Sequence, residues 1–232
     1  MVYILIKPNG QFIKERTRDV ARKTAEETER TRQQILKGAR DLFIRKGYNA
    51  TSMEDIRKHA DVSKGSIYYH FKSKQQLLMA ICEQRTIEWI EGWRRRVKPG
   101  MTPVEKLYAL ADYWQEDFDD PFLKVVDEFI TSFGGDPATL EKMIELVQMQ
   151  YPVIQSIIEE GIASGEFRKD DPAELAYMFS SLMGGLGMAY YEKVPRERAR
   201  AMYRKAAELF VRGISAEPAP GAGSRLRDRG SG

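Results

Sequence analysis

The chain has 232 residues, enough for one large domain or two small ones. It contains no run of 18 apolar residues, and its first residues lack the apolar core and cleavage site of a secretory signal, so neither a membrane span nor secretion is expected. A single cysteine, Cys82, excludes an internal disulfide and suits a reducing cytoplasm.

The net charge of +3 hides an uneven distribution. Residues 1–75 contain 17 Lys and Arg against 9 Asp and Glu, whereas the remaining residues contain 20 against 25. A basic N-terminal third followed by an acidic remainder is typical of a DNA-binding domain attached to a domain with another role.

The first predicted elements form a helix-turn-helix. Residues 1–28 carry no periodic apolar face and are expected to be a flexible extension, or alternatively a basic arm that follows a DNA groove. A helix is predicted over 29–46, with Ile35, Ala39, Leu42 and Phe43 on one face and Gly47 at its end.

The next segment predicts two short helices around a tight turn. Thr51 and Glu54 have capping-box spacing, so a helix is expected from Ser52, and a break follows at residues 61–63. Ser63 then caps a short helix over 64–71, with Ile67 and Phe71 pointing inward. This arrangement places the start of a second helix in the major groove of duplex DNA.

Three stretches of this region resemble the DNA-binding domain of the TetR family of bacterial transcriptional regulators. They are the apolar pattern over 35–48, the run TS-x-x-x-I over 51–56, and VSKGSIYYHFKSK over 62–74. Within the family the Ser-Lys-Gly and Tyr-Tyr-His-Phe runs are nearest to multidrug-efflux repressors. Asp61 replaces the usual turn glycine, and Arg57 the usual alanine. A family N-terminus would begin at Val20, which favours a dispensable segment over 1–19.

Helix N-terminal geometry and the matching family positions together predict the DNA contacts. Lys64 is expected at a phosphate or guanine edge, and Tyr69 and His70 at the DNA backbone. Thr51 or Ser52 is expected at a phosphate near the start of the first short helix, and Lys74 at another phosphate. The predicted DNA-binding set is Thr51, Ser52, Ser63, Lys64, Gly65, Ser66, Tyr68, Tyr69, His70 and Lys74.

The sequence pattern also predicts helices in the rest of the chain. They are predicted over 75–97, 102–118, 122–133, 138–164 with a kink at Pro152, 171–191 and 195–213, with a disordered tail over 215–232. The prediction is therefore an all-α protein of about nine helices. A helix-turn-helix domain spans 29–74, and a helical effector-binding and dimerisation domain spans 75–214.

The resemblance implies a homodimer formed through the last two long helices. Small residues spaced three and four apart on these helices allow close approach. The predicted interface residues are Phe179, Met183, Gly184, Gly187, Met202, Ala206, Leu209 and Phe210.

The resemblance also implies a cavity for a small-molecule effector in the second domain. Its aromatic and Met residues suit an apolar or aromatic guest, although most of them can equally be core. The predicted pocket residues are Trp89, Trp93, Tyr108, Trp114, Phe118, Phe129, Phe133, Met149 and Tyr151. The carboxylates Asp112, Glu116, Asp127 and Glu128 can either recognise a cation or form solvated faces.

Other functions find less support. The only histidines, His59 and His70, lie in the DNA head, and no phosphate loop, metal-ligand cluster or catalytic constellation is visible. We therefore expect no enzyme, no cofactor and no metal. The alternatives that stay open are a DNA-binding protein of the same fold that organises the chromosome without an effector, and a regulator of fatty-acid or aromatic metabolism rather than of efflux.

Overall fold

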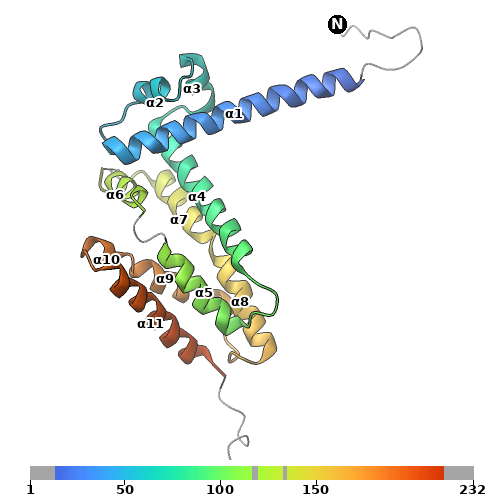
Figure 1. The fold of residues 1–232 in the computed structure, drawn as a ribbon, viewed down its shortest axis with the longest axis vertical. Coiled ribbons are helices and arrows are strands. Elements are labelled where there is room, and N and C mark those ends of the chain that lie inside the picture. The colour runs from blue at the N-terminus through green and yellow to red at the C-terminus, as the bar shows by residue number, and fades with distance from the viewer. Residues whose placement is uncertain (1–13, 117–119, 133–134, 217–232) are drawn as a thin grey trace, which may run out of the picture. The chain divides into compact units, whose positions relative to one another are not determined.

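The computed structural model describes residues 14–116, 120–132 and 135–216, with side chains from residue 24 onward. Within these ranges the chain forms eleven helices (Figure 1), and its only extended pairing is an isolated antiparallel bridge between Phe167 and Ser215. The all-helical prediction is confirmed. None of the described helices is long and apolar enough to cross a membrane.

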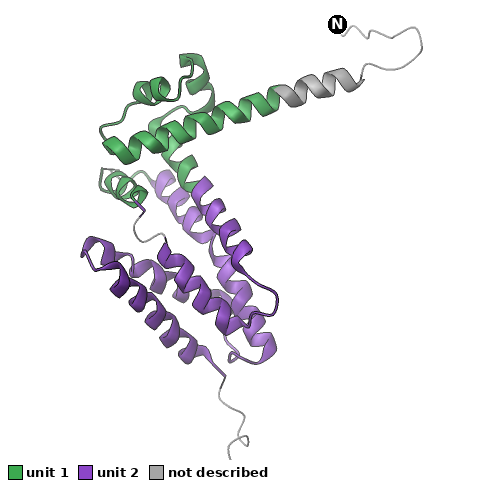
Figure 2. Ribbon diagram, viewed as in Figure 1, with its two compact units in different colours: residues 1–83, 121–136 green, residues 84–120, 137–232 purple. Residues whose placement is uncertain are grey.

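The chain divides into two compact units (Figure 2). Unit 1 comprises residues 1–83 and 121–136, and unit 2 comprises residues 84–120 and 137–232. The polypeptide thus leaves unit 2 for one helix and then returns to it.

Unit 1 contains the predicted helix-turn-helix and that additional helix. Its elements are α1 (Lys14–Lys46), α2 (Met53–His59), α3 (Lys64–His70), the first part of α4 (Lys74–Arg96) and α6 (Phe122–Ser132). Fully buried Ile35, Phe43, Ile56, Ile67 and Leu77 pack between these helices, as the apolar spacing predicts. Each of the short helices α2 and α3 thus buries one face and exposes the opposite face to solvent.

Helix α1 begins at Lys14 rather than near Glu29. The prediction required an apolar face, which residues 14–28 lack, but these residues are mostly good helix formers and extend a helix that is already nucleated. Thr28 and Thr31 satisfy their hydroxyls within the helix by donating to the carbonyls of Thr24 and Glu27.

Unit 2 is a bundle around one apolar core. It contains the second part of α4 and α5 (Pro103–Glu116), α7 (Pro137–Gln148), α8 (Tyr151–Ser164), α9 (Pro172–Gly185), α10 (Met188–Tyr191) and α11 (Arg196–Ile214). Helix α5 packs against α8 and α11, and α9 packs against α8 and α11. Leu107, Leu110, Ile154, Ile158 and Phe179 are fully buried at these contacts.

Two predicted helices are divided, which accounts for eleven helices instead of about nine. The helix predicted over 138–164 is interrupted after Gln148, and Pro152 lies in the first turn of α8. A proline is tolerated there because first-turn N–H groups have no partner within the helix. The helix predicted over 171–191 is interrupted at Leu186 and Gly187, between α9 and α10.

Candidate DNA-binding surface and effector site

The cap of α2 lies one residue later than predicted. The Ser52 hydroxyl accepts from the Asp55 N–H at 3.0 Å, and the Ser52 N–H donates to the Asp55 carboxylate at 3.0 Å. Thr51 is only 1% exposed, and its hydroxyl donates to the Gly47 carbonyl at 2.7 Å. Of the two residues expected at a phosphate here, Thr51 is therefore buried, whereas Ser52 is exposed at the start of α2.

The turn between α2 and α3 is braced by Arg57. Asp61 adopts a left-handed conformation with φ of 49°, which Asp tolerates better than most residues. The Arg57 guanidinium donates to the Val62 carbonyl at 3.1 Å and binds both oxygens of Glu54. The hydrogen bond from Arg57 lowers the pKa of Glu54. These contacts support a packing role for Arg57 rather than an extra phosphate contact.

Helix α3 presents polar side chains outward, as predicted. Ser63 caps the helix by accepting from the Ser66 N–H at 3.1 Å, and Ile67 and Phe71 are buried below. On the outer face Lys64 and Gly65 are exposed, and Tyr68 and Tyr69 are 42% and 71% exposed. Neither Lys64 nor the ring of Tyr68 has a bonded partner among the described residues, so both are available to a ligand.

His70 lies at the edge of this face. Its ring meets the Tyr69 ring edge to face, with centroids 5.0 Å apart. Burial, and secondarily the charge of Arg32, lowers the pKa of His70. The lowered pKa favours the neutral imidazole, which can donate a hydrogen bond to a DNA backbone oxygen.

The loop from α1 to α2 is held by a residue of α6. The Glu128 carboxylate accepts from the N–H groups of Tyr48 and Asn49, at 2.8 and 2.9 Å. Gly47 has a φ of 86°, and a Cβ there would lie 2.7 Å from the same carboxylate, so only glycine fits. Glu128 is thus neither a solvated residue nor free to recognise a cation.

Lys74 belongs to the same assembly. Its ammonium donates to the Tyr48 carbonyl at 2.8 Å and lies 4.3 Å from the centre of the Tyr48 ring. Burial lowers the pKa of Lys74, while the charge of Glu128 opposes that shift. These contacts favour an internal role for Lys74 over the predicted phosphate contact. Phe129, predicted as a pocket wall, is buried against the Tyr48 ring at 5.1 Å.

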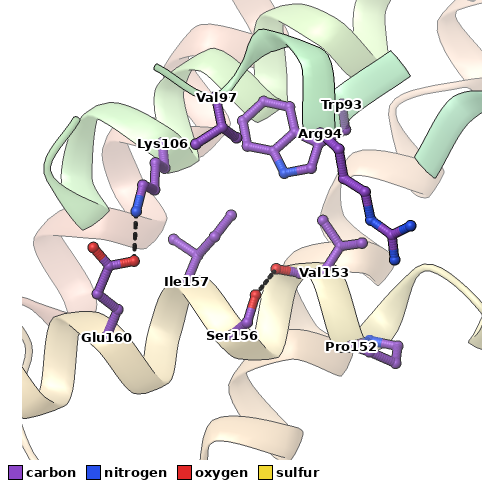
Figure 3. A pocket seen from close by; sticks show the side chains of 9 residues that line it. All are labelled: Trp93, Arg94, Val97, Lys106, Pro152, Val153, Ser156, Ile157 and Glu160. Carbon is purple, nitrogen blue, oxygen red and sulfur yellow. Dashed lines mark hydrogen bonds and ion pairs between the residues drawn. The ribbon is translucent and has the colours of Figure 1, made fainter. Parts of the chain in front are cut away.

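Unit 2 contains a cavity of about 390 Å³ between the end of α4, the start of α5 and the middle of α8. Figure 3 shows the side chains that line it. They are Trp93, Arg94, Val97, Lys106, Pro152, Val153, Ser156, Ile157 and Glu160. The size lies in the range of small-molecule sites. We call this space the α4–α5–α8 cavity.

Of the predicted pocket residues, Trp93 lines this cavity, and the others that the structure describes lie elsewhere. Trp89 is buried, stacks on Tyr113 at 5.1 Å and meets Trp114 edge to face at 5.2 Å. Tyr151 contacts Tyr177 edge to face. Tyr108 packs against the core, Met149 is half-buried, and Phe118 and Phe133 lie outside the described residues. Most of the aromatic residues are thus core.

Two further carboxylates considered for cation recognition are already paired. Asp112 on α5 binds Arg204 on α11 through two hydrogen bonds, at 2.6 and 2.8 Å. Glu116 pairs with Arg96. These carboxylates therefore serve contacts between helices.

The predicted dimer residues divide into two groups. Phe179, Met183 and Ala206 are buried within this chain, and Phe179 meets Phe210 edge to face at 5.1 Å. Met202 and Gly187 are half-buried, whereas Gly184 and Leu209 are exposed. The exposed apolar residues on α9 to α11 comprise Leu209, which was predicted, and Tyr177, Met178, Leu182, Met188 and Tyr191, which were not, each at least 38% exposed.

Several predictions fall outside what the structure describes. The side chains of Lys14, Arg16, Arg18, Arg22 and Lys23 are not among the described side chains, and the tail beyond residue 216 is not described. Within the described residues no group of three His, Cys, Asp or Glu side chains is arranged to hold a metal ion.

Comparison with known proteins agrees with this geometry. Residues 35–81 match the family of bacterial regulatory proteins of the tetR type, and residues 85–216 match the C-terminal region of QacR-like proteins. The chain is similar to the HTH-type transcriptional regulator QacR of Staphylococcus aureus, at 30% identity over 182 residues, 78% of this chain and 96% of QacR.

Two further transcriptional regulators are also similar to most of the chain. The transcriptional repressor KstR2 of Mycolicibacterium smegmatis is 28% identical over 64% of this chain and 73% of its own length. A TetR-family regulator structure from Pectobacterium atrosepticum is 26% identical with a TM-score of 0.67, covering 83% of this chain and 98% of that one. The chain belongs to the TetR family of bacterial transcriptional regulators, with a QacR-like C-terminal region.

Proposed function

We propose that the chain is a ligand-responsive transcriptional repressor. As a homodimer it binds a two-fold symmetric operator, and a largely apolar or aromatic small molecule releases it. The observation that carries this proposal is the outer face of α3, where Lys64, Tyr68 and Tyr69 are exposed beside a capped helix start. Such a helix start donates N–H groups and positive charge to DNA phosphates.

The exposed apolar residues of α9 to α11 support a dimer. Tyr177, Met178, Leu182 and Leu209 lie on a surface that a single chain leaves open to water. Covering such a surface with the same surface of a second copy gives a two-fold interface. Two recognition helices related by a two-fold axis fit half-sites spaced about 34–36 Å apart.

Release by an effector is supported by the course of α4. Residues of this helix up to Glu83 belong to unit 1, which contains α3, whereas Trp93, Arg94 and Val97 line the α4–α5–α8 cavity in unit 2. A ligand that prefers one conformer of α4 shifts the population of DNA-binding conformers only by its difference in affinity for the two. Such a repressor acts in the cytoplasm, where the bacterial chromosome lies.

The experiment is a selection of duplex sequences from a random library by the purified full-length chain, followed by a mobility shift. We expect a two-fold symmetric sequence bound by an even number of chains, with affinity that decreases steeply as salt increases. Sequence-independent binding would favour the chromosome-organising alternative, and no binding would refute the proposal.

A further inference from the structure

We propose that the effector binds in the α4–α5–α8 cavity and is an apolar or aromatic molecule carrying one anionic group, which Arg94 binds. The inference rests on the proposed function, because it assigns the chemical class of the molecule that regulates DNA binding. Two features of the cavity support it: the balance of its charges and the position of its apolar wall.

Two cations and one anion line the cavity. The Lys106 ammonium lies 2.5 Å from a carboxylate oxygen of Glu160, and the Lys106 side chain is only 13% exposed. A lysine that is largely removed from water needs such a partner, so these two charges compensate each other. Arg94, in contrast, has no ion pair or hydrogen bond to any residue that the structure describes. The lining therefore carries one uncompensated positive charge.

The neighbouring arginines of α4 differ from Arg94 in this respect. Arg95 lies within 4.0 Å of Glu91, and Arg96 pairs with Glu116. Neither lines the cavity. Of the three arginines at the end of α4, Arg94 is thus the one that is both unpaired and directed to the cavity.

The charges stand at opposite ends of an apolar wall. Figure 3 shows the Lys106–Glu160 pair at one end and the Arg94 guanidinium at the other, near Pro152 and Val153. Trp93, Val97 and Ile157 line the space between them. A molecule with an apolar body and one terminal anion can lie along this wall with its charge at Arg94. The planar guanidinium binds carboxylate, sulfonate or phosphate through paired hydrogen bonds.

The same lining disfavours a cationic effector. Glu160, the one acidic side chain of the cavity, is already bound by Lys106. A cationic ligand would meet the exposed Arg94 without a free carboxylate to compensate it, and like charges repel. Ser156 is uncharged, and its hydroxyl donates to the Val153 carbonyl at 2.9 Å within α8.

The test compares three ligands that share one alkyl chain and differ in charge: decanoate, decanol and decylammonium. Each is titrated, below its aggregation concentration, into the full-length chain, and heat and tryptophan fluorescence are recorded. We expect decanoate to bind at least about tenfold more tightly than decylammonium, because a charge-assisted hydrogen bond is gained in one case and a repulsion in the other. Decanol should be intermediate.

Three variants assign the effect to Arg94. Arg94→Ala should weaken decanoate binding roughly five- to tenfold. Arg94→Glu should reverse the order, so that decylammonium binds more tightly than decanoate. Arg95→Ala is the matched control, since it removes the same charge one residue away, and it should leave the order unchanged.

The outcomes separate this inference from the proposed function. Equal binding of the three ligands, tighter binding of decylammonium, no binding at all, or equal losses from Arg94→Ala and Arg95→Ala would each overturn the anionic site. A mobility shift with the selected operator is run in parallel. Binding of decanoate at Arg94 without release of operator would uphold the site and refute the inducible function instead.

Discussion

Two neighbouring regions of unit 1 contain similar polar residues and use them in opposite ways. On α3, Lys64 and Tyr69 are exposed, with the lysine unpaired in the described structure. At the loop from α1 to α2, Thr51 of the loop and Lys74 of α4 donate to loop carbonyls, and Glu128 of α6 accepts from loop N–H groups. The difference shows that residue type alone does not identify a candidate DNA contact, because Lys64 is exposed on α3 whereas Lys74 is bound to the loop that precedes α2.

The largest effect on DNA binding is expected from the α3 face. Lys64→Ala and Tyr69→Ala should each weaken operator binding by about 1–3 kcal/mol, because each removes a contact to a base edge or a phosphate. The thermal unfolding of both variants should stay close to that of the parent, since neither side chain is buried. Lys205→Ala on α11 is the control for charge removal elsewhere. Unchanged operator affinity in both α3 variants would show that α3 is not the DNA-recognition helix.

The opposite behaviour is expected at the loop. Glu128→Ala leaves the Tyr48 and Asn49 N–H groups without their acceptor and should lower the free energy of unfolding by about 1–3 kcal/mol. Urea denaturation at a fixed protein concentration measures it. Asp127→Ala, the neighbouring carboxylate, should change the stability little. If Glu128→Ala were as stable as the parent, the carboxylate would not be holding the loop.

Removal of Arg57, which binds the turn between α2 and α3, should have a smaller effect on operator affinity. Arg57→Ala removes the hydrogen bond to the Val62 carbonyl and should weaken operator binding less than tenfold, through the position of α3. Adding Asp61→Gly should recover part of the loss, because glycine adopts a positive φ without strain. Operator titrations of the single and double variants measure this. A loss that Asp61→Gly does not reduce, together with a weaker salt dependence, would point to a phosphate contact by Arg57.

The smallest effect concerns pH. In the free protein the pKa of His70 is lowered by burial and by Arg32. If His70 lies beside a phosphate in the complex, that negative charge raises its pKa, and DNA binding takes up a proton. Operator affinity should then increase modestly as the pH decreases from 7.5 towards 6. His70→Asn should flatten this slope, and a slope of the same size in the variant would assign the proton to another group.

The parts of the site that were predictable depend on residues close in sequence. The cap at Ser63 and the inward positions of Ile67 and Phe71 follow from spacings of a few residues. The α2 cap shows the limit of such reasoning. Thr51 with Glu54 and Ser52 with Asp55 have the same spacing, but the Thr51 hydroxyl is bound to the Gly47 carbonyl and Glu54 is bound by Arg57, so the second pair forms the cap.

Contacts between distant residues were not predictable. Glu128 and Tyr48 are 80 residues apart, and nothing in either local sequence indicates that they meet. Aromatic composition likewise could not distinguish residues that line the cavity from residues that only pack in the core. Trp93 lines the cavity, whereas Trp89, four residues earlier on the same helix, stacks on Tyr113 in the core.

The salt dependence of operator binding tests most directly whether Lys64 reads DNA while Lys74 supports the loop. The slope of log affinity against log salt reports the number of phosphates neutralised. Lys64→Ala should reduce that slope by about one if it removes a phosphate contact. Lys74→Met should lower stability and leave the slope unchanged, because its ammonium is bound to the Tyr48 carbonyl. A reduced slope in Lys74→Met, with the parent's slope and affinity retained in Lys64→Ala, would contradict this assignment.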